Sequence, residues 1–169
     1  LLQEFHNLPN GNYFKQICRG YSSGFEFSML GKMKYARDKL AQDLSSCESV
    51  LDVGCGGGHM AARLKAGNIN DVWGLDPSPY LLQHAARDYP EIKFIQGLAE
   101  QTGFADNRFG GVSVCFVFHE MPPRFSGQAL AEFYRILSPG GLVSIVEPAP
   151  EQMYLSYWRM LTKYGLTGL

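Results

Sequence analysis

The chain has 169 residues, of which 46% are hydrophobic and 18% are charged, and its formal net charge is -1. This length suits one domain with a buried core, and the lack of a basic run excludes an electrostatic surface for nucleic acid. No apolar stretch approaches the roughly 18 residues that cross a bilayer, and residues 1–10 do not resemble a signal peptide. We therefore predict a cytoplasmic protein without a nucleic-acid or membrane partner.

Residues 1–48 are rich in aromatic side chains and contain no strand-like run. Within them, residues 29–44 place apolar side chains at helical spacing, with Lys and Arg between them. We predict that residues 1–48 form a helical cap over a ligand site. Residues 49–169 are predicted to form an α/β core, and the two parts together make one structural domain.

From residue 49 onward, short apolar runs alternate with helical stretches, the order that parallel strands joined by helices require. Strands are predicted at Ser49–Val53, Val72–Leu75, Ile92–Gln96, Val112–Phe118 and Leu142–Val146. Helices are predicted at His59–Ala66, Pro79–Tyr89, Ser126–Leu137 and Glu151–Tyr164, with a turn at 138–141. The sequence thus predicts a Rossmann-like, doubly wound α/β fold, with a mostly parallel sheet and helices on both faces.

A glycine-rich loop, Gly54-Cys55-Gly56-Gly57-Gly58-His59, follows the first predicted strand. Glycines let a ligand approach the backbone closely, and ligands of open α/β sheets bind at the carboxyl ends of the strands. A dinucleotide loop follows G-x-G-x-x-G, but His59 stands at the third position and the spacing is G-x-G-x-G. Asp52 precedes the loop, and its carboxylate suits an ammonium better than a pyrophosphate. The loop therefore favours S-adenosyl-L-methionine (SAM), which has an ammonium and no phosphate.

A second carboxylate, Asp76, ends the second predicted strand, about twenty residues after the glycine loop, the usual distance for a ribose-binding acid. A carboxylate at this place accepts hydrogen bonds from ribose hydroxyls, and it serves NAD and SAM equally. The alternative is that Asp76 only begins the Asp-Pro-Ser-Pro turn.

These motifs resemble those of the class I SAM-dependent methyltransferases, in particular the small-molecule group with a type 11-like domain. The matching segments are 51–58, Gly74-Leu75-Asp76-Pro77-Ser78, Gly97-Leu98-Ala99-Glu100, 104–109 and 135–141. Each segment alone is a weak signal, but five in the same order and spacing are a strong one.

The resemblance implies that the chain binds SAM, releases S-adenosyl-L-homocysteine and needs no metal. The glycine loop would face the methionine part of SAM, Leu98 and Ala99 would frame the adenine, and residues 115–118 would lie near the reactive methyl. The implied cofactor contacts are Asp52, Gly54, Cys55, Gly56, Gly58, Asp76, Pro77, Leu98, Ala99 and Phe116.

Three departures from the family pattern stand out. Leu98 replaces a frequent Asp, which removes a side-chain acceptor for the adenine amino group; Glu100 or backbone carbonyls would have to compensate. Gly110 and Gly111 follow Phe109, and we expect them to loosen the start of the fourth strand. The sequence also lacks room for the two edge strands that usually complete the sheet, so we expect a truncated form of a longer protein or a shorter sheet.

His119 is the candidate catalytic residue, because it directly follows the fourth predicted strand, where the methyl group should point. An ordinary imidazole pKa of about 6.5 suits proton removal from an acceptor near neutral pH. The alternative is a His that only shapes the loop, since methyl transfer needs positioning more than a base.

We therefore predict an enzyme, a monomer or homodimer, that transfers a methyl group from SAM to O, N or C of a small molecule. Two alternatives stay open. One is a catalytically inactive SAM-binding protein with a regulatory or assembly role. The other is an NAD-dependent oxidoreductase, which the residue at the third glycine position disfavours.

Overall fold

The computed structural model describes Lys15 and residues 32–148 of the chain. Five strands form one sheet: β1 (Ser49–Val53), β2 (Asp71–Asp76), β3 (Lys93–Gln96), β4 (Phe109–Cys115) and β5 (Leu137–Val146). The helices are α2 (Lys32–Asp43), α3 (His59–Ala66), α4 (Pro79–Asp88) and α5 (Pro123–Ile136), with a 3-10 turn, η2 (Phe118–Glu120). The strand order is β3-β2-β1-β4-β5 and every pairing is parallel.

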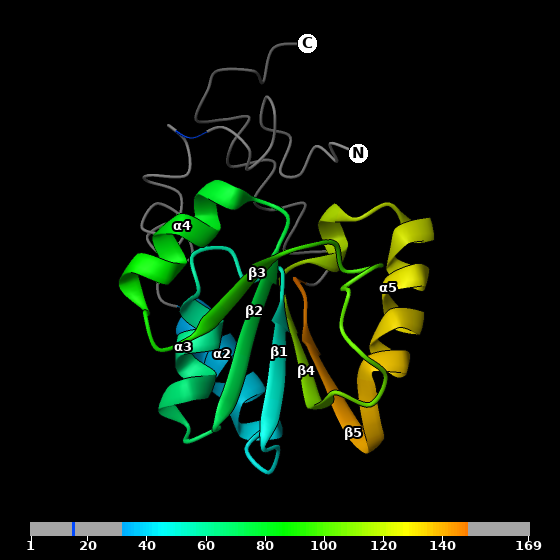
Figure 1. Ribbon diagram of the computed structural model, residues 1–169, viewed down its shortest axis with the longest axis horizontal. Helices are drawn as coiled ribbons and strands as arrows, with labels where there is room; N and C mark the ends of the chain where they lie inside the picture. The colour runs from blue at the N-terminus through cyan, green and yellow to red at the C-terminus, as the bar shows by residue number, and fades with distance from the viewer. Residues whose placement is uncertain (1–14, 16–31, 149–169) are drawn as a thin grey trace.

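Helices cover both faces of this sheet, as the sequence predicts (Figure 1). Helices α2, α3 and α4 lie on one face, and α5 lies on the other. No helix within the described ranges is long and apolar enough to cross a membrane. Two predicted parts lie outside the described residues: the helix Glu151–Tyr164 and most of the cap at residues 1–48. The described part of the cap includes α2, which packs against α3, β4 and β5.

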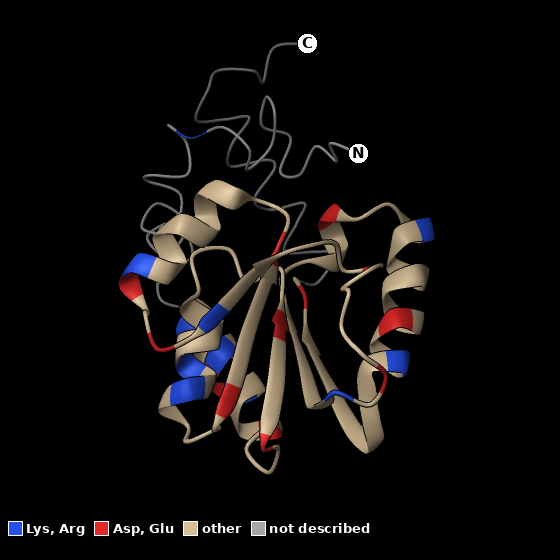
Figure 2. Cartoon of the chain, in the orientation of Figure 1, with Lys and Arg blue, Asp and Glu red and all other residues tan. Residues whose placement is uncertain are grey.

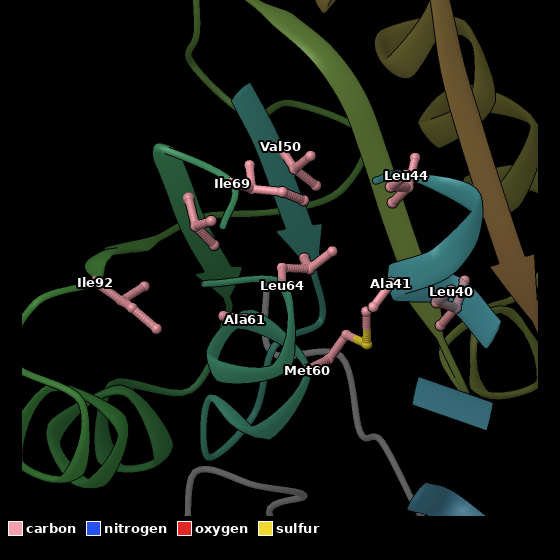
Figure 3. Close-up of a cluster of buried hydrophobic side chains, with 10 residues drawn as sticks. Leu40, Ala41, Leu44, Val50, Met60, Ala61, Leu64, Ile69 and Ile92 are labelled. Atoms are coloured by element: carbon pink, nitrogen blue, oxygen red, sulfur yellow. The ribbon is translucent and has the colours of Figure 1, made fainter. Parts of the chain in front are cut away.

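Two apolar clusters fill the space between the sheet and its helices. On the α2–α3 side, Leu40 and Leu44 meet Val50 of β1 and Leu64 of α3 (Figure 3). On the α5 side the cluster consists of Leu51, Val53, Leu75, Phe109, Val112, Val114, Met121, Ala129, Phe133 and Ile136. Successive residues of β1 therefore point to opposite cores, as a strand buried on both faces requires.

The fourth strand differs from its predicted bounds. It begins three residues earlier and ends at Cys115, because Phe116 has a φ of +59° and leaves the extended conformation. The start of this strand pairs irregularly with β5 between Phe109 and Gly111, in line with the expected loosening, but Gly111 itself is closely packed. A Cβ on Gly111 would lie 3.0 Å from Leu44 Cδ2 and 3.0 Å from Cys47 Sγ, so the glycine lets the turn that follows α2 pack closely on β4.

The predicted turn at 138–141 is an irregularity inside β5. Pairing with β4 passes from Phe109 opposite Leu137 to Gly111 opposite Leu142, so the intervening residues bulge out of register. Helix α5 begins at Pro123, three residues earlier than predicted, since proline is well suited to the first turn of a helix.

Candidate cofactor and acceptor site

The carboxyl ends of the five strands meet at one edge of the sheet, and the predicted site residues gather there. Asp52 and Asp76 come from neighbouring parallel strands, with Asp52 opposite Gly74 in register. Figure 2 shows Asp or Glu on η2 and at this end of the strands, where the strands themselves carry no Lys or Arg; Lys and Arg lie on α2, α3 and the start of β3 and also on α4 and α5. The edge therefore presents negative charge, which favours a cationic ligand.

The glycine loop between β1 and α3 adopts a conformation that glycine accepts readily. Gly54, Gly56 and Gly58 have φ values of +67°, +50° and +83°, a region that L side chains rarely adopt. The backbone N–H groups of Gly54 and Cys55 both donate to the Leu75 carbonyl, at 2.8 and 3.0 Å. A loop in which Cys55 carries the one side chain between Gly54 and Gly58 is thus fixed over the ends of β1 and β2.

The Asp76 carboxylate ties this loop to the turn that precedes α4. Its Oδ2 accepts the Gly56 N–H at 2.8 Å and its Oδ1 accepts the Ser78 N–H at 2.8 Å. The Ser78 hydroxyl in turn accepts the Leu81 N–H and caps α4, with Pro79 in its first turn. A carboxylate offers about four lone-pair positions, so hydrogen bonds to these two amides are compatible with further bonds to ribose hydroxyls.

Asp52 is the most unusual group at the edge, because its carboxylate is 1% exposed. The Ser113 hydroxyl donates to Oδ1 at 2.5 Å, while Oδ2 has no hydrogen-bond partner in the described part of the chain. Burial raises the pKa of Asp52 from 3.8 to about 7, with the nearby charge of Asp76 adding to the increase and Ser113 opposing it. A buried carboxylate with an orphaned oxygen fits a cationic ligand.

Cys55 is buried in the same loop and its side chain packs under β2. A Cβ on Gly74 would lie 2.8 Å from Cys55 Sγ, so the thiol fills the space that the glycine leaves. Burial raises the pKa of this thiol well above 9. The residue therefore acts as a small apolar group rather than a nucleophile.

The predicted adenine-facing segment follows β3. Gly97 N–H donates to the Asp76 carbonyl at 3.2 Å, and the half-buried Leu98 forms a short bridge with Gln101. The side chain of Gln96 donates to the Pro77 carbonyl at 3.0 Å. Residues 97–99 are thus held next to Pro77 and Asp76, which places the expected ribose and adenine contacts side by side.

Glu147, which directly follows β5, is a site residue that the sequence analysis missed. Its Oε1 accepts the N–H groups of Val117 and Phe118, both at 2.7 Å. Its Oε2 lies 2.7 Å from Nδ1 of His119. A carboxylate at the end of a strand was the signal used for Asp52 and Asp76, and the same rule applied to β5 would have found it.

His119 lies between two carboxylates and does not have the ordinary pKa expected from the sequence. Nε2 is 3.4 Å from Glu120 Oε1, and Nδ1 faces Glu147. Glu120 and Glu147 together raise the pKa of His119 to about 9. The ring is therefore an imidazolium at neutral pH, and it cannot accept a proton there.

Comparison with known proteins connects these features. Residues 50–141 match the family described as "Methyltransferase domain", over half of the chain. The chain belongs to the class I SAM-dependent methyltransferases. A demethylmenaquinone methyltransferase from Chlorobaculum parvum is 36% identical over 116 residues, covering 65% of this chain and 47% of that protein. A sterol 24-C-methyltransferase from Pneumocystis carinii is 31% identical over an alignment of 182 residues, which covers 97% of this chain and 43% of that protein.

The methyltransferase chain spans about half the length of the curated relatives it matches. Among solved structures, a SAM-dependent methyltransferase from Archaeoglobus fulgidus has a TM-score of 0.66 over 85% of this chain and 73% of that one, at 18% identity, which shows a common fold. The [4+2]-cyclase SpnF has a TM-score of 0.62 at 26% identity, over 67% of this chain and 44% of that one.

Proposed function

We propose that this chain binds SAM at the edge formed by β1 and β2 and transfers its methyl group to a small-molecule acceptor held near β4 and β5. The observation that carries the proposal is the buried Asp52 carboxylate with its orphaned Oδ2, placed beneath a loop of left-handed glycines. A cation is the ligand that such a group favours most strongly. SAM combines a cationic ammonium with a ribose and carries no phosphate for this acidic edge to repel.

Each predicted cofactor contact has a role in this proposal. Asp52 attracts the ammonium by charge, and Asp76 accepts hydrogen bonds from the ribose while it holds Gly56. The glycine loop leaves room for the methionine portion, since a Cβ on Gly56 would meet, among the residues that the structure describes, only Leu81, at 3.9 Å. Pro77, Leu98 and Ala99 border the adenine. Phe116 and the segment after it face the methyl group.

The chemistry requires little of the protein beyond position. The sulfonium of SAM already activates the methyl carbon for in-line displacement, so the chain mainly has to align the acceptor and exclude water. The imidazolium of His119 supplies a fixed positive charge at the acceptor side rather than a base at neutral pH. Any proton that the acceptor loses leaves to another group or to water.

The relatives suggest which acceptors to test first. Two of them are named for demethylmenaquinone and for carbon 24 of a sterol, both apolar ring compounds. The half-buried Phe116, whose ring lies edge-on to His119 with centroids 6.1 Å apart, adds an aromatic surface at the same place. We propose an apolar small molecule as the acceptor, methylated at O, N or C.

The direct test is to incubate the purified protein with SAM and a panel of quinols, sterols, phenols and amines. Mass spectrometry should find an acceptor product heavier by one CH2 group together with an equal amount of S-adenosyl-L-homocysteine. If SAM binds tightly while no panel member gains a methyl group, the inactive SAM-binding alternative is favoured. An acceptor that changes without consuming SAM would indicate chemistry of the kind for which the cyclase SpnF is named.

A further inference from the structure

The Glu147 carboxylate joins the end of β5 to the segment that follows β4. Besides the two amides at Oε1, its Oε2 accepts the His119 N–H at 3.3 Å and faces the His119 ring at 2.7 Å. One side chain thus makes contacts with three consecutive residues that lie about thirty positions earlier in the chain. Such charge-assisted hydrogen bonds are roughly twice as strong as neutral ones.

The segment held in this way is strained at its beginning. Phe116 has a φ of +59°, which is unfavourable for a bulky residue by about 1–3 kcal/mol and persists only where surrounding contacts enforce it. Its N–H donates to the Val146 carbonyl at 2.9 Å. Val146 and Glu147 therefore fix both sides of the bend in residues 116–119.

The same segment touches the cofactor loop. A Cβ on Gly54 would lie 2.5 Å from Cγ2 of Val117, so the Val117 side chain rests directly on the first glycine. The contacts run without a gap from Glu147 through Val117 to Gly54. The segment that faces the acceptor and the loop that faces the cofactor are in van der Waals contact.

We propose that Glu147 is a positioning residue that holds residues 116–119 against the glycine loop and fixes the His119 ring between two carboxylates. This positioning role depends on the proposed function in one respect: it takes residues 116–119 as the side of the site that faces the acceptor. In this arrangement both ring nitrogens of His119 face carboxylate oxygens, from Glu147 and from Glu120. His119 then serves as a locked cation, and the acceptor is activated without it.

Two substitutions separate the parts of this proposal. Glu147→Gln keeps a carbonyl oxygen for the amides of Val117 and Phe118 but removes the charge beside His119. Glu147→Ala removes both. Glu91→Gln, an exposed acid before β3, is the matched control.

The first readout is the titration of the His119 ring, followed by NMR and assigned by the loss of its signal in His119→Asn. The wild-type midpoint is expected near pH 9, and Glu147→Gln should lower it by at least one unit. The second readout is amide hydrogen exchange at Val117 and Phe118, which should stay within threefold of wild type in Glu147→Gln and rise at least tenfold in Glu147→Ala. The affinity for SAM should fall at least tenfold in Glu147→Ala alone.

An unchanged His119 midpoint in Glu147→Gln, or unchanged exchange in a folded Glu147→Ala protein, would overturn the positioning role. If the alanine variant does not fold, the glutamine variant and its titration still decide. Neither NMR nor exchange depends on turnover. A protein that shows both effects but methylates nothing would keep this inference and lose the proposed function instead.

Discussion

The two halves of the carboxyl edge are built in different ways. The cofactor half, between β1 and β2, is made mainly of backbone: three left-handed glycines and amides that converge on Asp76. The acceptor half, between β4 and β5, is made of side chains, with Glu147 holding a strained bend and a charged His119. The backbone of the first half has a fixed shape that suits one ligand. In the second half a few side-chain contacts hold the segment after β4, and the rest of its surface can vary with the acceptor.

The largest effect should come from disturbing the contact between Gly54 and Val117, through which the glycine loop of the cofactor half meets the segment after β4. Gly54→Ala places a Cβ in a left-handed conformation and 2.5 Å from Val117 Cγ2. Strain and overpacking together should lower the free energy of unfolding by about 3–5 kcal/mol. Binding of SAM should be lost, and calorimetry together with denaturant unfolding measures both.

Gly127→Ala is the matched control for this substitution. Gly127 lies within α5, and a Cβ there meets no atom of the described residues within 4 Å. Replacing a glycine inside a helix should raise the stability by about 0.5–1 kcal/mol and leave SAM binding unchanged. If Gly54→Ala behaves like this control, the two halves are not coupled through that contact.

A smaller effect is expected from neutralising the buried carboxylate of the cofactor half. The pKa of Asp52 is raised from 3.8 to about 7 in the fold, so its contribution to stability is fully present below pH 3.8 and is lost as the pH rises through 7. Asp52→Asn cannot ionise and should be more stable than wild type at pH 8, by on the order of 3 kcal/mol. The difference should shrink toward pH 5.

The same variant should bind SAM at least tenfold more weakly at pH 8, because the charge that attracts the ammonium is gone. Unfolding curves and SAM titrations at pH 5, 6.5 and 8 provide the measurement. An Asp52→Asn protein that keeps its SAM affinity would show that the buried carboxylate is only structural.

The smallest effect on stability and SAM binding should come from substituting Glu132, whose contacts lie outside both halves. Glu132 of α5 accepts the Thr102 N–H at 2.9 Å and pairs with Arg135, which also donates to the Phe104 carbonyl at 2.8 Å. These bonds hold the long connection between β3 and β4 against α5. Glu132→Gln should lower the stability at pH 7 by about 1–2 kcal/mol and change SAM affinity less than threefold.

This effect has a defined pH window. Hydrogen bonds from Arg135 and Thr102 lower the pKa of Glu132 from 4.5 to about 2. Its stabilisation is therefore present above pH 4.5 and disappears as the pH falls through 2. The unfolding midpoints of wild type and Glu132→Gln should converge at low pH, and a gap that persists at pH 2 would contradict the ion-pair explanation.

The comparison of the two halves also explains what could be predicted from the sequence. The sheet, its helices and the glycine loop were predictable because their signals are local. Apolar periodicity and glycines that accept a positive φ each determine the conformation of residues only a few positions away in the chain. The carboxylates Asp52 and Asp76 were predictable, since Asp52 lies one residue before the end of β1, next to that loop, and Asp76 ends β2. Their proximity in the fold follows from the parallel pairing of β1 with β2.

The acceptor half was harder to predict for a physical reason. The raised pKa of His119 depends on the adjacent Glu120 and on Glu147, which lies 28 positions away in the chain. No local pattern indicates the contact with Glu147. The end of β4 was misplaced because the positive φ of Phe116 is enforced by β5, not by the residue itself. Similarly, only the fold shows that Leu44 and Cys47, in the turn after α2, pack onto Gly111.

The most direct test of the central claim is calorimetric titration of SAM, S-adenosyl-L-homocysteine and NAD into the wild-type chain, Asp76→Asn and the control Glu91→Gln. Our account predicts that wild type and Glu91→Gln bind SAM and its product but not NAD. It also predicts that Asp76→Asn loses at least tenfold in SAM affinity, because the amide cannot hold both the loop and the ribose. NAD binding by the wild type, or unchanged SAM affinity in Asp76→Asn, would contradict it.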